Sequence, residues 1–471
     1  MNEPLQFILN DRQLSVEVPP GLLVLDLLRE HLRQVGTKEG CREGDCGACV
    51  VLVGELSGDG VRYRAVTSCL MPAGELAGKH LITIEGLRAP VLSSLQEAIV
   101  EEGASQCGFC TPGIVLSLTG ALLERSEPMD AAAVKTALGG HLCRCTGYRS
   151  LKAVRHALED SPVGVPALVG SGELPGWMLT IPQRLRALGP DTTTNGAASP
   201  GRAIAGGTDL YVQQGDALAE DASVQVLGNR ADLRGIVDKE DSLWIGPSTT
   251  FEQLAESDAI RRLVPEIRAY MDDIASVQIR NRATVGGNLV NASPIGDVTI
   301  LLLAFDTHLA LTAPDGAERT VPLRRFYRGY KDIDLGPGEL VTGITVRKPP
   351  SGAVVSWEKV SKRRSLDIAS VNSALLIHSS GDTIESATLT FGGVAPVPFL
   401  AAQTSSWMAG KPLNAETVRE AGEYVQREIA PISDIRGSAS YKRLLARQLL
   451  WAHITTLFPD QVQLEALYEE H

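Results

Sequence analysis

The chain has 471 residues, of which 44% are hydrophobic and 21% charged, and it carries a formal net charge of −12. This composition is typical of a globular protein with several domains of roughly 150 residues each, and the acidic surplus argues against a nucleic-acid partner. No charged segment followed by an apolar core opens the sequence, and no stretch reaches the ~18 apolar residues of a membrane span. We therefore expect a cytoplasmic protein without a membrane partner, where disulfides are disfavoured.

The first predicted elements surround a group of cysteines. Residues 5–9 and 14–18 alternate in polarity on either side of Asn10-Asp11, which predicts a hairpin. Residues 22–32 have helical periodicity, and residues 50–53 continue as a strand towards Cys69. This order of elements is that of a β-grasp ferredoxin.

The first cysteine group consists of Cys41, Cys46 and Cys49, spaced C-x4-C-x2-C, with Cys69 further along. This is the spacing of a plant-type [2Fe–2S] ligand loop. The glycines and small residues between the cysteines let the backbone wrap around an anionic cluster and point its amides at the sulfurs. A structural zinc site and unrelated buried thiols are the alternatives, but zinc sites favour paired C-x2-C knuckles.

The second cysteine group comprises a C-x2-C motif within residues 107–113 and a C-x-C motif at 143–145. The first motif leads into an apolar helical stretch, 114–123, with Pro112 suited to the first turn. Asp130 is placed to cap the intervening helix, so two helix–turn elements would bring the motifs together. Taken alone these cysteines fit zinc or a redox dithiol, but beside the first group a second iron–sulfur cluster is favoured.

Residues 161–177 are rich in Pro, Gly and small side chains, which predicts an interdomain linker. Beyond it, Gly-Gly motifs occur within 203–210 and 282–289, and the second continues to Asp297. Backbone without side chains allows a pyrophosphate to approach amide and Thr hydroxyl donors. Neither motif is a Rossmann or Walker loop, and spacing alone does not separate a cofactor loop from an ordinary turn.

Two phrases, QCGFCTPG at 106–113 and CRCTGY at 143–148, resemble the xanthine oxidase family of molybdenum hydroxylases. The resemblance extends over nearly the whole chain and implies an α+β multidomain fold. The implied domains are a β-grasp [2Fe–2S] ferredoxin domain at 1–88, a four-helix [2Fe–2S] domain at 89–160, the linker at 161–177, an FAD-binding α/β domain of the vanillyl-alcohol oxidase (PCMH) type at 178–350, and a small α+β C-terminal flavoprotein subdomain at 351–471.

The same resemblance assigns the cluster ligands and the flavin contacts. Cys107, Cys110, Cys143 and Cys145 are implied to hold the cluster nearer the molybdenum, and Cys41, Cys46, Cys49 and Cys69 the cluster nearer the flavin. The Gly-Gly motifs are implied to hold the diphosphate and ribityl parts of FAD. The implied flavin- and nicotinamide-site residues are Ile204, Ala205, Gly206, Gly207, Thr208, Asp209, Leu210, Ile274, Thr284, Val285, Gly286, Gly287, Asn288, Asp297, Tyr330, Val341, Lys359 and Asp367.

Four of these assignments have a further argument or an alternative. Lys359 would place a cation near the flavin, where it stabilises a reduced anion. Tyr330 and Asp367 match segments beside the nicotinamide. Without the resemblance, each of Lys359, Tyr330 and Asp367 would be interpreted as a surface charge or a core tyrosine. Ile274 stands where many relatives carry an aromatic side chain.

The resemblance leaves no segment for a molybdopterin domain, so no catalytic residue for the substrate is expected here. It implies that electrons leave a purine, hypoxanthine or xanthine, at the molybdenum centre of a large partner subunit. They would pass through both clusters to FAD and then to NAD⁺. Fusion of the clusters and FAD in one chain favours this purine chemistry, in a heterotetramer of two small and two large chains.

Several alternatives stay open at this point. The chain could serve another molybdenum hydroxylase, acting on an aldehyde or an N-heterocycle, or could be a stand-alone NADH-linked electron-transfer flavoprotein. A zinc-stabilised interaction protein is a third class. Oxygen in place of NAD⁺ is an alternative acceptor.

Overall fold

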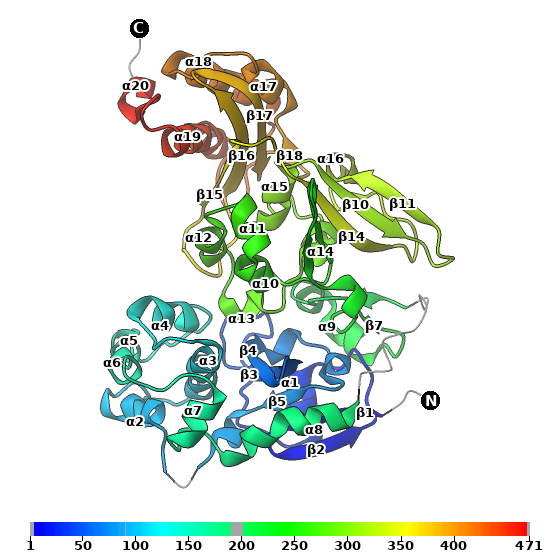
Figure 1. Cartoon of the computed structure of the whole chain (residues 1–471), viewed down its shortest axis with the longest axis vertical. Coiled ribbons are helices and arrows are strands. Elements are labelled where there is room, and N and C mark those ends of the chain that lie inside the picture. The colour runs from blue at the N-terminus through cyan, green and yellow to red at the C-terminus, as the bar shows by residue number, and fades with distance from the viewer. Residues whose placement is uncertain (1–3, 90, 190–200, 469–471) are drawn as a thin grey trace. The chain divides into compact units, whose positions relative to one another are not determined.

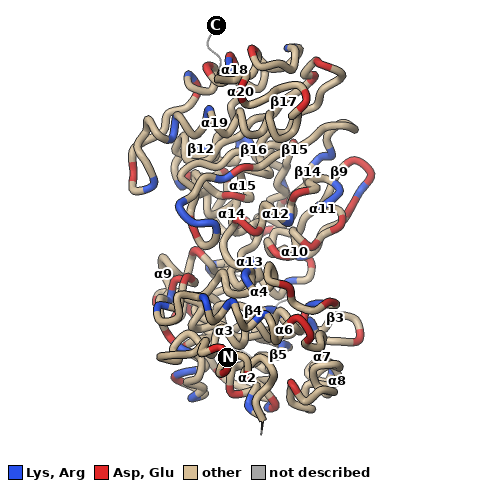
Figure 2. The backbone as a smooth tube through the Cα atoms, turned by 90° about the vertical axis from the view of Figure 1, so that its left-hand side faces the viewer, with Lys and Arg blue, Asp and Glu red and all other residues tan. Residues whose placement is uncertain are grey.

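The computed structural model describes residues 4–89, 91–189 and 201–468 and divides into two compact units. Unit 1 takes in residues 1–230 and 275–283, and unit 2 takes in 231–274 and 284–471 (Figure 1). Figure 2 shows acidic and basic residues interspersed along the backbone of both units. The expected α+β multidomain architecture is confirmed.

A five-stranded sheet in the order β2-β1-β5-β3-β4 forms the N-terminal part of unit 1. Asn10 has a φ of 53°, a left-handed conformation that Asn tolerates, so the predicted hairpin is confirmed with its second strand starting at Arg12. The predicted strand at 50–53 is longer than expected and pairs with a neighbour that leads to Cys69. The strands are β1 (Leu5–Leu9), β2 (Arg12–Val16), β3 (Val50–Ser57), β4 (Gly60–Thr67) and β5 (His80–Ile82).

Short helical segments complete this β-grasp fold. The predicted helix within 22–32 is confirmed, and its buried Val24, Leu27 and Leu28 pack with Phe7 and Val51 of the sheet. The segments are α1 (Val24–Asp26), a π-helical turn (Leu27–His31), and 3-10 turns at Ser68–Leu70, Ala73–Leu76 and Ile84–Leu87.

The helical part of unit 1 follows. Pro112 lies in the first turn of its longest helix, and Asp130 Oδ1 accepts a hydrogen bond from Ala133 N at 2.8 Å, so both predicted end signals are confirmed. A capping box of Ser93 and Gln96 begins the preceding helix. The helices are α2 (Ser94–Glu101), α3 (Thr111–Glu124), α4 (Ala131–Leu138), α5 (Arg149–Ala153) and α6 (Arg155–Leu158).

The segment expected as a linker, 161–177, is folded in this structure. It contains α7 (Val165–Gly170) and the start of a 3-10 turn (Gly176–Thr180) that leads into α8 (Ile181–Leu188). Leu168 and Leu174 are buried in the same core as α3. Pro and Gly, which indicate a linker by composition, also occupy the first and last positions of helices, so composition alone did not separate the two outcomes.

Four further elements complete the described part of unit 1. A parallel pair, β6 (Ala203–Ile204) and β7 (Gln225–Val226), flanks α9 (Leu210–Glu220). Later in the chain α13 (Val277–Arg280) belongs to the same unit. Residues 190–200, which fall inside the predicted FAD-binding domain, lie outside the described residues.

Unit 2 contains a five-stranded antiparallel sheet in the order β11-β10-β14-β9-β8, accompanied by short helices. The strands are β8 (Ile236–Asp238), β9 (Ser242–Ile245), β10 (Thr307–Thr312), β11 (Glu318–Pro322) and β14 (Leu340–Arg347), with a separate β12 (Tyr327–Gly329) and β13 (Asp332–Ile333) ribbon. The helices are a 3-10 turn (Ala231–Leu233), α10 (Phe251–Glu256), α11 (Asp258–Leu263), α12 (Ile267–Asp272), α14 (Val285–Asn291), α15 (Asp297–Leu303) and α16 (Leu323–Phe326).

Among the described residues, the C-terminal part of unit 2 combines a four-stranded sheet with four helices, which agrees with the predicted α+β character. Leu375 and Phe391 of the sheet pack with Val418 and Leu450 of the helices in one core. The strands are β15 (Val354–Val360), β16 (Val371–Ser380), β17 (Thr383–Gly392) and β18 (Phe399–Leu400), and the helices α17 (Ala402–Met408), α18 (Ala415–Glu428), α19 (Ala439–Leu457) and α20 (Leu464–Tyr468). Among the described residues, none of the helices combines the length and the apolar character needed to cross a bilayer.

Candidate functional site

The first cysteine loop turns its backbone amides toward its own sulfurs. Cys41 N donates to Cys46 Sγ at 3.4 Å, and Glu43 N donates to Cys41 Sγ at 3.3 Å. Gly44 and Gly47 have φ values of 81° and 68°, which glycine adopts without steric cost. The Cys46 thiol lies within hydrogen-bond reach of Cys41 and lowers the pKa of that thiol. A loop of this kind favours a negatively charged occupant.

Cys49 and Cys69 form a second, buried pair. Each is 2% exposed, and the β3–β4 hairpin brings them together by pairing Val50 with Thr67. The Cys69 thiol is hydrogen-bonded to Cys49 and lowers its pKa, despite the opposing effect of burial. Ser68 Oγ also donates to the Cys49 carbonyl at 2.7 Å, which fixes the turn that carries Cys69.

The second cysteine group is also arranged as two pairs. Cys107 and Cys145 are exposed and hydrogen-bonded to each other, whereas Cys110 and Cys143 form a buried pair. Burial, followed by the hydrogen bond with Cys143, raises the pKa of Cys110 to about 12. The helix–turn elements at α3 and after α4 therefore bring the C-x2-C and C-x-C motifs together as predicted.

Pairwise grouping decides which inorganic group the cysteines fit. In a [2Fe–2S] cluster each iron takes two cysteine thiolates, whereas structural zinc takes four ligands around one ion. Over the described parts of the chain, no three His, Cys, Asp or Glu side chains converge as ligands of a single ion. All eight cysteines are free thiols. Two thiol pairs in each cysteine group are the donor set that a [2Fe–2S] cluster requires.

His141, two residues before Cys143, packs against helix α3. Its Nε2 lies 2.7 Å from Ser117 Oγ on α3, and the side chain is buried. Burial lowers the pKa of His141 to about 3, so the imidazole is neutral.

The first Gly-Gly motif, 204–210, links β6 to α9 in unit 1. Gly207 has a φ of 73°. A Cβ on Gly206 would lie 2.2 Å from the carbonyl oxygen of Arg282. The buried Arg282 guanidinium donates to Gly206 O at 2.6 Å and to Glu75 Oε2 at 3.0 Å. A glycine loop fixed just before a helix N-terminus is the arrangement that binds pyrophosphate, so the residues present fit that group.

We expect Gly206→Ala to destabilise unit 1 and to weaken flavin retention. The added methyl overlaps the Arg282 carbonyl, and overpacking of this kind costs about 1–3 kcal/mol. The matched control is Gly215→Ala in α9, where a Cβ meets nothing within 4 Å. Thermal unfolding and flavin content of the purified chain measure the effect. Equal values for the two variants would contradict the constraint on this loop.

The glycines of the second Gly-Gly motif, Gly286 and Gly287, lie in unit 2, in the first turn of a helix rather than in an open loop. Thr284 is the N-cap of α14, and its Oγ1 accepts a hydrogen bond from Gly287 N at 3.2 Å. A Cβ on Gly286 would lie 2.8 Å from the Pro247 carbonyl oxygen. Asn288 Oδ1 accepts from the Thr299 backbone amide at 3.0 Å and from its hydroxyl at 2.8 Å. The motif thus ties α14 to α15.

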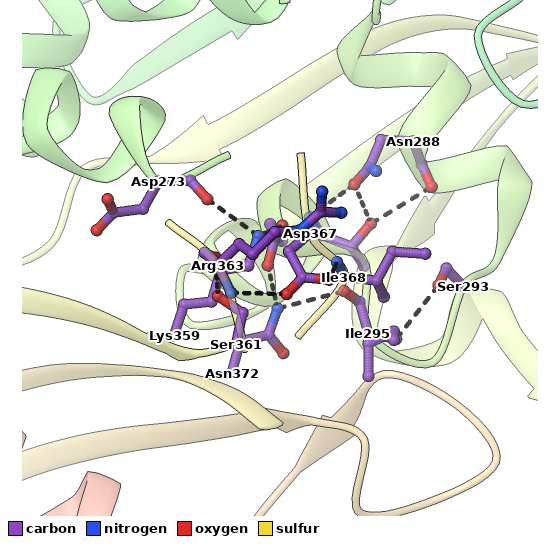
Figure 3. A network of polar contacts seen from close by, with 12 residues as sticks. Asp273, Asn288, Ser293, Ile295, Lys359, Ser361, Arg363, Asp367, Ile368 and Asn372 are labelled. Carbon is purple, nitrogen blue, oxygen red and sulfur yellow. Dashed lines mark hydrogen bonds and ion pairs between the residues drawn. The ribbon is translucent and has the colours of Figure 1, made fainter. Parts of the chain in front are cut away.

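Two of the predicted flavin residues, Lys359 and Asp297, form an ion pair in unit 2. Figure 3 shows the surrounding polar network, with Lys359, Asp273 and Asn372 labelled. Lys359 Nζ lies 2.8 Å from Asp297 Oδ2 and donates to the Asp273 carbonyl at 3.0 Å. The Lys359 side chain is only 2% exposed. Burial raises the pKa of Asp297, and the ammonium of Lys359 and the amide of Asn372 oppose this rise.

Asn372 completes this group, and its role was not predicted from the sequence. Its Nδ2 donates to Asp297 Oδ1 at 2.6 Å and to the Ile295 carbonyl at 3.3 Å. Asn is depleted in strands, so an Asn within the largely apolar strand β16 was the signal available.

The remaining predicted residues occupy different environments within unit 2. Ile274 and Val341 are buried, and Val341 of β14 pairs with Leu311 in the core of the five-stranded sheet. Tyr330 is 68% exposed. Asp367 lies in a loop, where its Oδ2 accepts from Arg363 N at 2.8 Å. Their roles toward a cofactor stay predictions.

Four family models match the chain in succession. They describe a 2Fe-2S iron-sulfur cluster binding domain (residues 7–74), a [2Fe-2S] binding domain (83–155), an FAD binding domain in molybdopterin dehydrogenase (192–349) and a CO dehydrogenase flavoprotein C-terminal domain (358–457). The predicted order of cluster, cluster and FAD domains is confirmed. The domain boundaries drawn from the sequence stay predictions.

Similar proteins include enzymes with different names. Xanthine dehydrogenase of Emericella nidulans is 29% identical, covering 87% of this chain and 35% of its own length, and aldehyde oxidase 1 of Rattus norvegicus is 27% identical, covering 92% and 38%. The chain thus spans little more than a third of these relatives. A solved chain of reconstituted CO dehydrogenase from Oligotropha carboxidovorans is 31% identical with a TM-score of 0.51, covering 54% of this chain and 88% of that one.

Proposed function

Since the chain belongs to the xanthine oxidase family of molybdenum hydroxylases, as an iron–sulfur and FAD chain, we propose that it is the electron-transfer subunit of a xanthine dehydrogenase. It would receive electrons from hypoxanthine or xanthine, oxidised on a large molybdopterin-binding partner, and deliver them to NAD⁺. When bound, the clusters supply one-electron steps, and FAD combines them into a two-electron transfer.

The pairing of all eight cysteines carries this proposal. Each group offers two thiol pairs, and in the first group amides point at the sulfurs. Hydrogen bonds of this kind stabilise the thiolate form that binds iron. Free thiols in such number suit a reducing compartment such as the cytoplasm.

In unit 2 the chain's own residues support flavin binding through a fixed cation. Lys359 is immobilised by Asp297 and by the Asp273 carbonyl, so its charge is fixed in place. A positive charge held close to the flavin would favour the reduced, anionic form. Asn372 orients the Asp297 carboxylate and therefore acts through it.

The substrate and partner assignments rest on similarity alone. Relatives named xanthine dehydrogenase favour a purine, and a heterotetramer of two small and two large chains would carry the molybdenum cofactor on the large ones. The relative named aldehyde oxidase supports the alternative of another hydroxylase, acting on an aldehyde or N-heterocycle. Turnover of the assembled complex with xanthine and with an aldehyde distinguishes them, and parallel assays with NAD⁺ and oxygen identify the acceptor.

Metal and flavin analysis of the tagged, co-purified chain tests the cofactor content. Two clusters of two irons predict four iron atoms and one FAD per chain, with molybdenum present only when a larger partner is co-purified. Molybdenum bound to this chain alone would contradict the division of labour. Zinc without iron would instead indicate a zinc-stabilised interaction protein. If no large partner co-purifies, the chain would be a stand-alone electron-transfer flavoprotein.

A further inference from the structure

The two cysteine loops of unit 1 touch each other through glycine. A Cβ on Gly113, in the first turn of α3, would lie 2.1 Å from the carbonyl oxygen of Gly47. A Cβ on Gly47 would lie 2.3 Å from His141 Nδ1 and 2.5 Å from the Gly140 carbonyl oxygen. Gly47 lies between Cys46 and Cys49, and Gly113 follows Cys110 by three residues. Backbone therefore meets backbone at this point, with no side chain between.

Hydrogen bonds fasten the same contact. Leu142 N donates to the Cys46 carbonyl at 3.0 Å, so the residue preceding Cys143 is bonded directly to a cysteine of the other group. His141 is held by Ser117 Oγ at 2.7 Å. Buried Gln278 of α13 donates to the same hydroxyl at 2.9 Å and to the Ala137 carbonyl at 2.8 Å. The loop that carries His141, helix α3 and helix α4 are thus joined in one buried polar network.

We propose that Gly47 and Gly113 are positioning residues, whose direct backbone contact sets the separation between the two iron–sulfur clusters. This inference rests on the proposed function, in which each cysteine group holds one cluster. A methyl group on Gly113 overlaps Gly47 O, and interiors this closely packed transmit strain, so the Cys46–Cys49 segment must move away. Since electron transfer slows steeply with distance, the glycine contact keeps the transfer between clusters fast.

Gly113→Ala is the sharpest test. Gly113 does not have a positive φ, and Ala has the higher helix propensity, so the variant does not disfavour α3 itself. The matched control is Gly170→Ala in the same unit, where a Cβ meets nothing within 4 Å. The probe is the magnetic interaction between the two clusters, recorded by low-temperature electron paramagnetic resonance of the dithionite-reduced full-length chain.

We expect the unaltered chain and Gly170→Ala to show spin–spin splitting, and Gly113→Ala to lose part of that splitting while keeping its iron. Unchanged splitting in Gly113→Ala with full iron content would overturn the inference, as would unsplit signals in the unaltered chain. If Gly113→Ala loses iron, the Ser117→Ala variant provides the test instead, because it removes the hydrogen-bond partner of His141 without adding atoms to the contact. The spin–spin splitting of Ser117→Ala should weaken or broaden, and an unchanged spectrum of this variant would overturn the inference. Absence of both signals in the unaltered chain contradicts the proposed function instead.

Discussion

Cys49→Ser is expected to remove one of the two clusters and with it half the iron of the chain. The thiolate is the metal-binding form of cysteine, and a serine hydroxyl does not ionise near neutral pH. Cys49 immediately precedes β3 and is 2% exposed, as is Cys69, which follows β4. The substitution therefore leaves a buried thiol without its partner as well as an incomplete ligand set.

Folding is expected to suffer together with iron binding. Cys49 and Cys69 pack in one core with Leu70, Ile204 and Tyr211, so loss of the cluster loosens the start of the first Gly-Gly motif as well. Binding of a metal group to the folded state contributes to folding stability. We expect a lower thermal midpoint and a reduced flavin content in addition to the lost iron.

Cys145→Ser is the comparison that separates ligand loss from core damage. Cys145 is exposed, so its replacement should also remove half the iron, but with a smaller change in thermal midpoint. The two variants should lose different electron paramagnetic resonance signals, which assigns each signal to a cysteine group. Retention of all the iron by Cys49→Ser would contradict the ligand assignment.

The sequence predicted those features whose signal is local. The β1–β2 hairpin follows from alternation around Asn10, whose left-handed φ matches its residue type. Both cysteine groups were identified from spacing and neighbouring residues, and Asp130 from its position before a helix. Each of these signals spans only a few residues, because turns, caps and ligand loops depend on local backbone geometry.

The contacts that the sequence did not predict join residues far apart in the chain. Gln278 reaches Ser117 across 161 positions, and Asn281 donates to the Ala65 carbonyl across 216 positions. A buried polar side chain needs a hydrogen-bond partner, but periodicity does not say which distant residue provides it. The same reason explains why Asn372 was missed beside Asp297.

Lys359→Met is expected to destabilise unit 2 strongly. The Lys359 side chain is 2% exposed and that of Asp297 14% exposed, so the substitution leaves a buried carboxylate without its cation. Breaking a buried ion pair in this way costs about 3–5 kcal/mol. For a unit of this size that corresponds to a fall in its thermal midpoint of roughly 6 °C or more.

The loss of stability in Lys359→Met is expected to grow as the pH rises. Burial already raises the pKa of Asp297 above its usual range, and Lys359 opposes this rise, so the variant raises the pKa further. A native pKa above the unfolded value means that the folded state keeps a proton that the unfolded state has released. The protonated carboxyl therefore contributes full stability below the unfolded pKa, about 4, and this contribution is lost as pH rises through the native pKa.

The double variant Lys359→Met/Asp297→Asn isolates the ionic part of the effect. Asn is a neutral isostere of Asp, so the double variant carries no buried charge at this site. Its thermal midpoint should therefore recover most of the loss, and that midpoint should not change across the same pH range. Thermal unfolding of the flavin-loaded chain from acid to neutral pH measures all three proteins. An equally steep pH dependence in the double variant would contradict the assignment to Asp297. If Lys359 also lies beside the flavin, both variants lower the flavin reduction potential, because each removes the same cation.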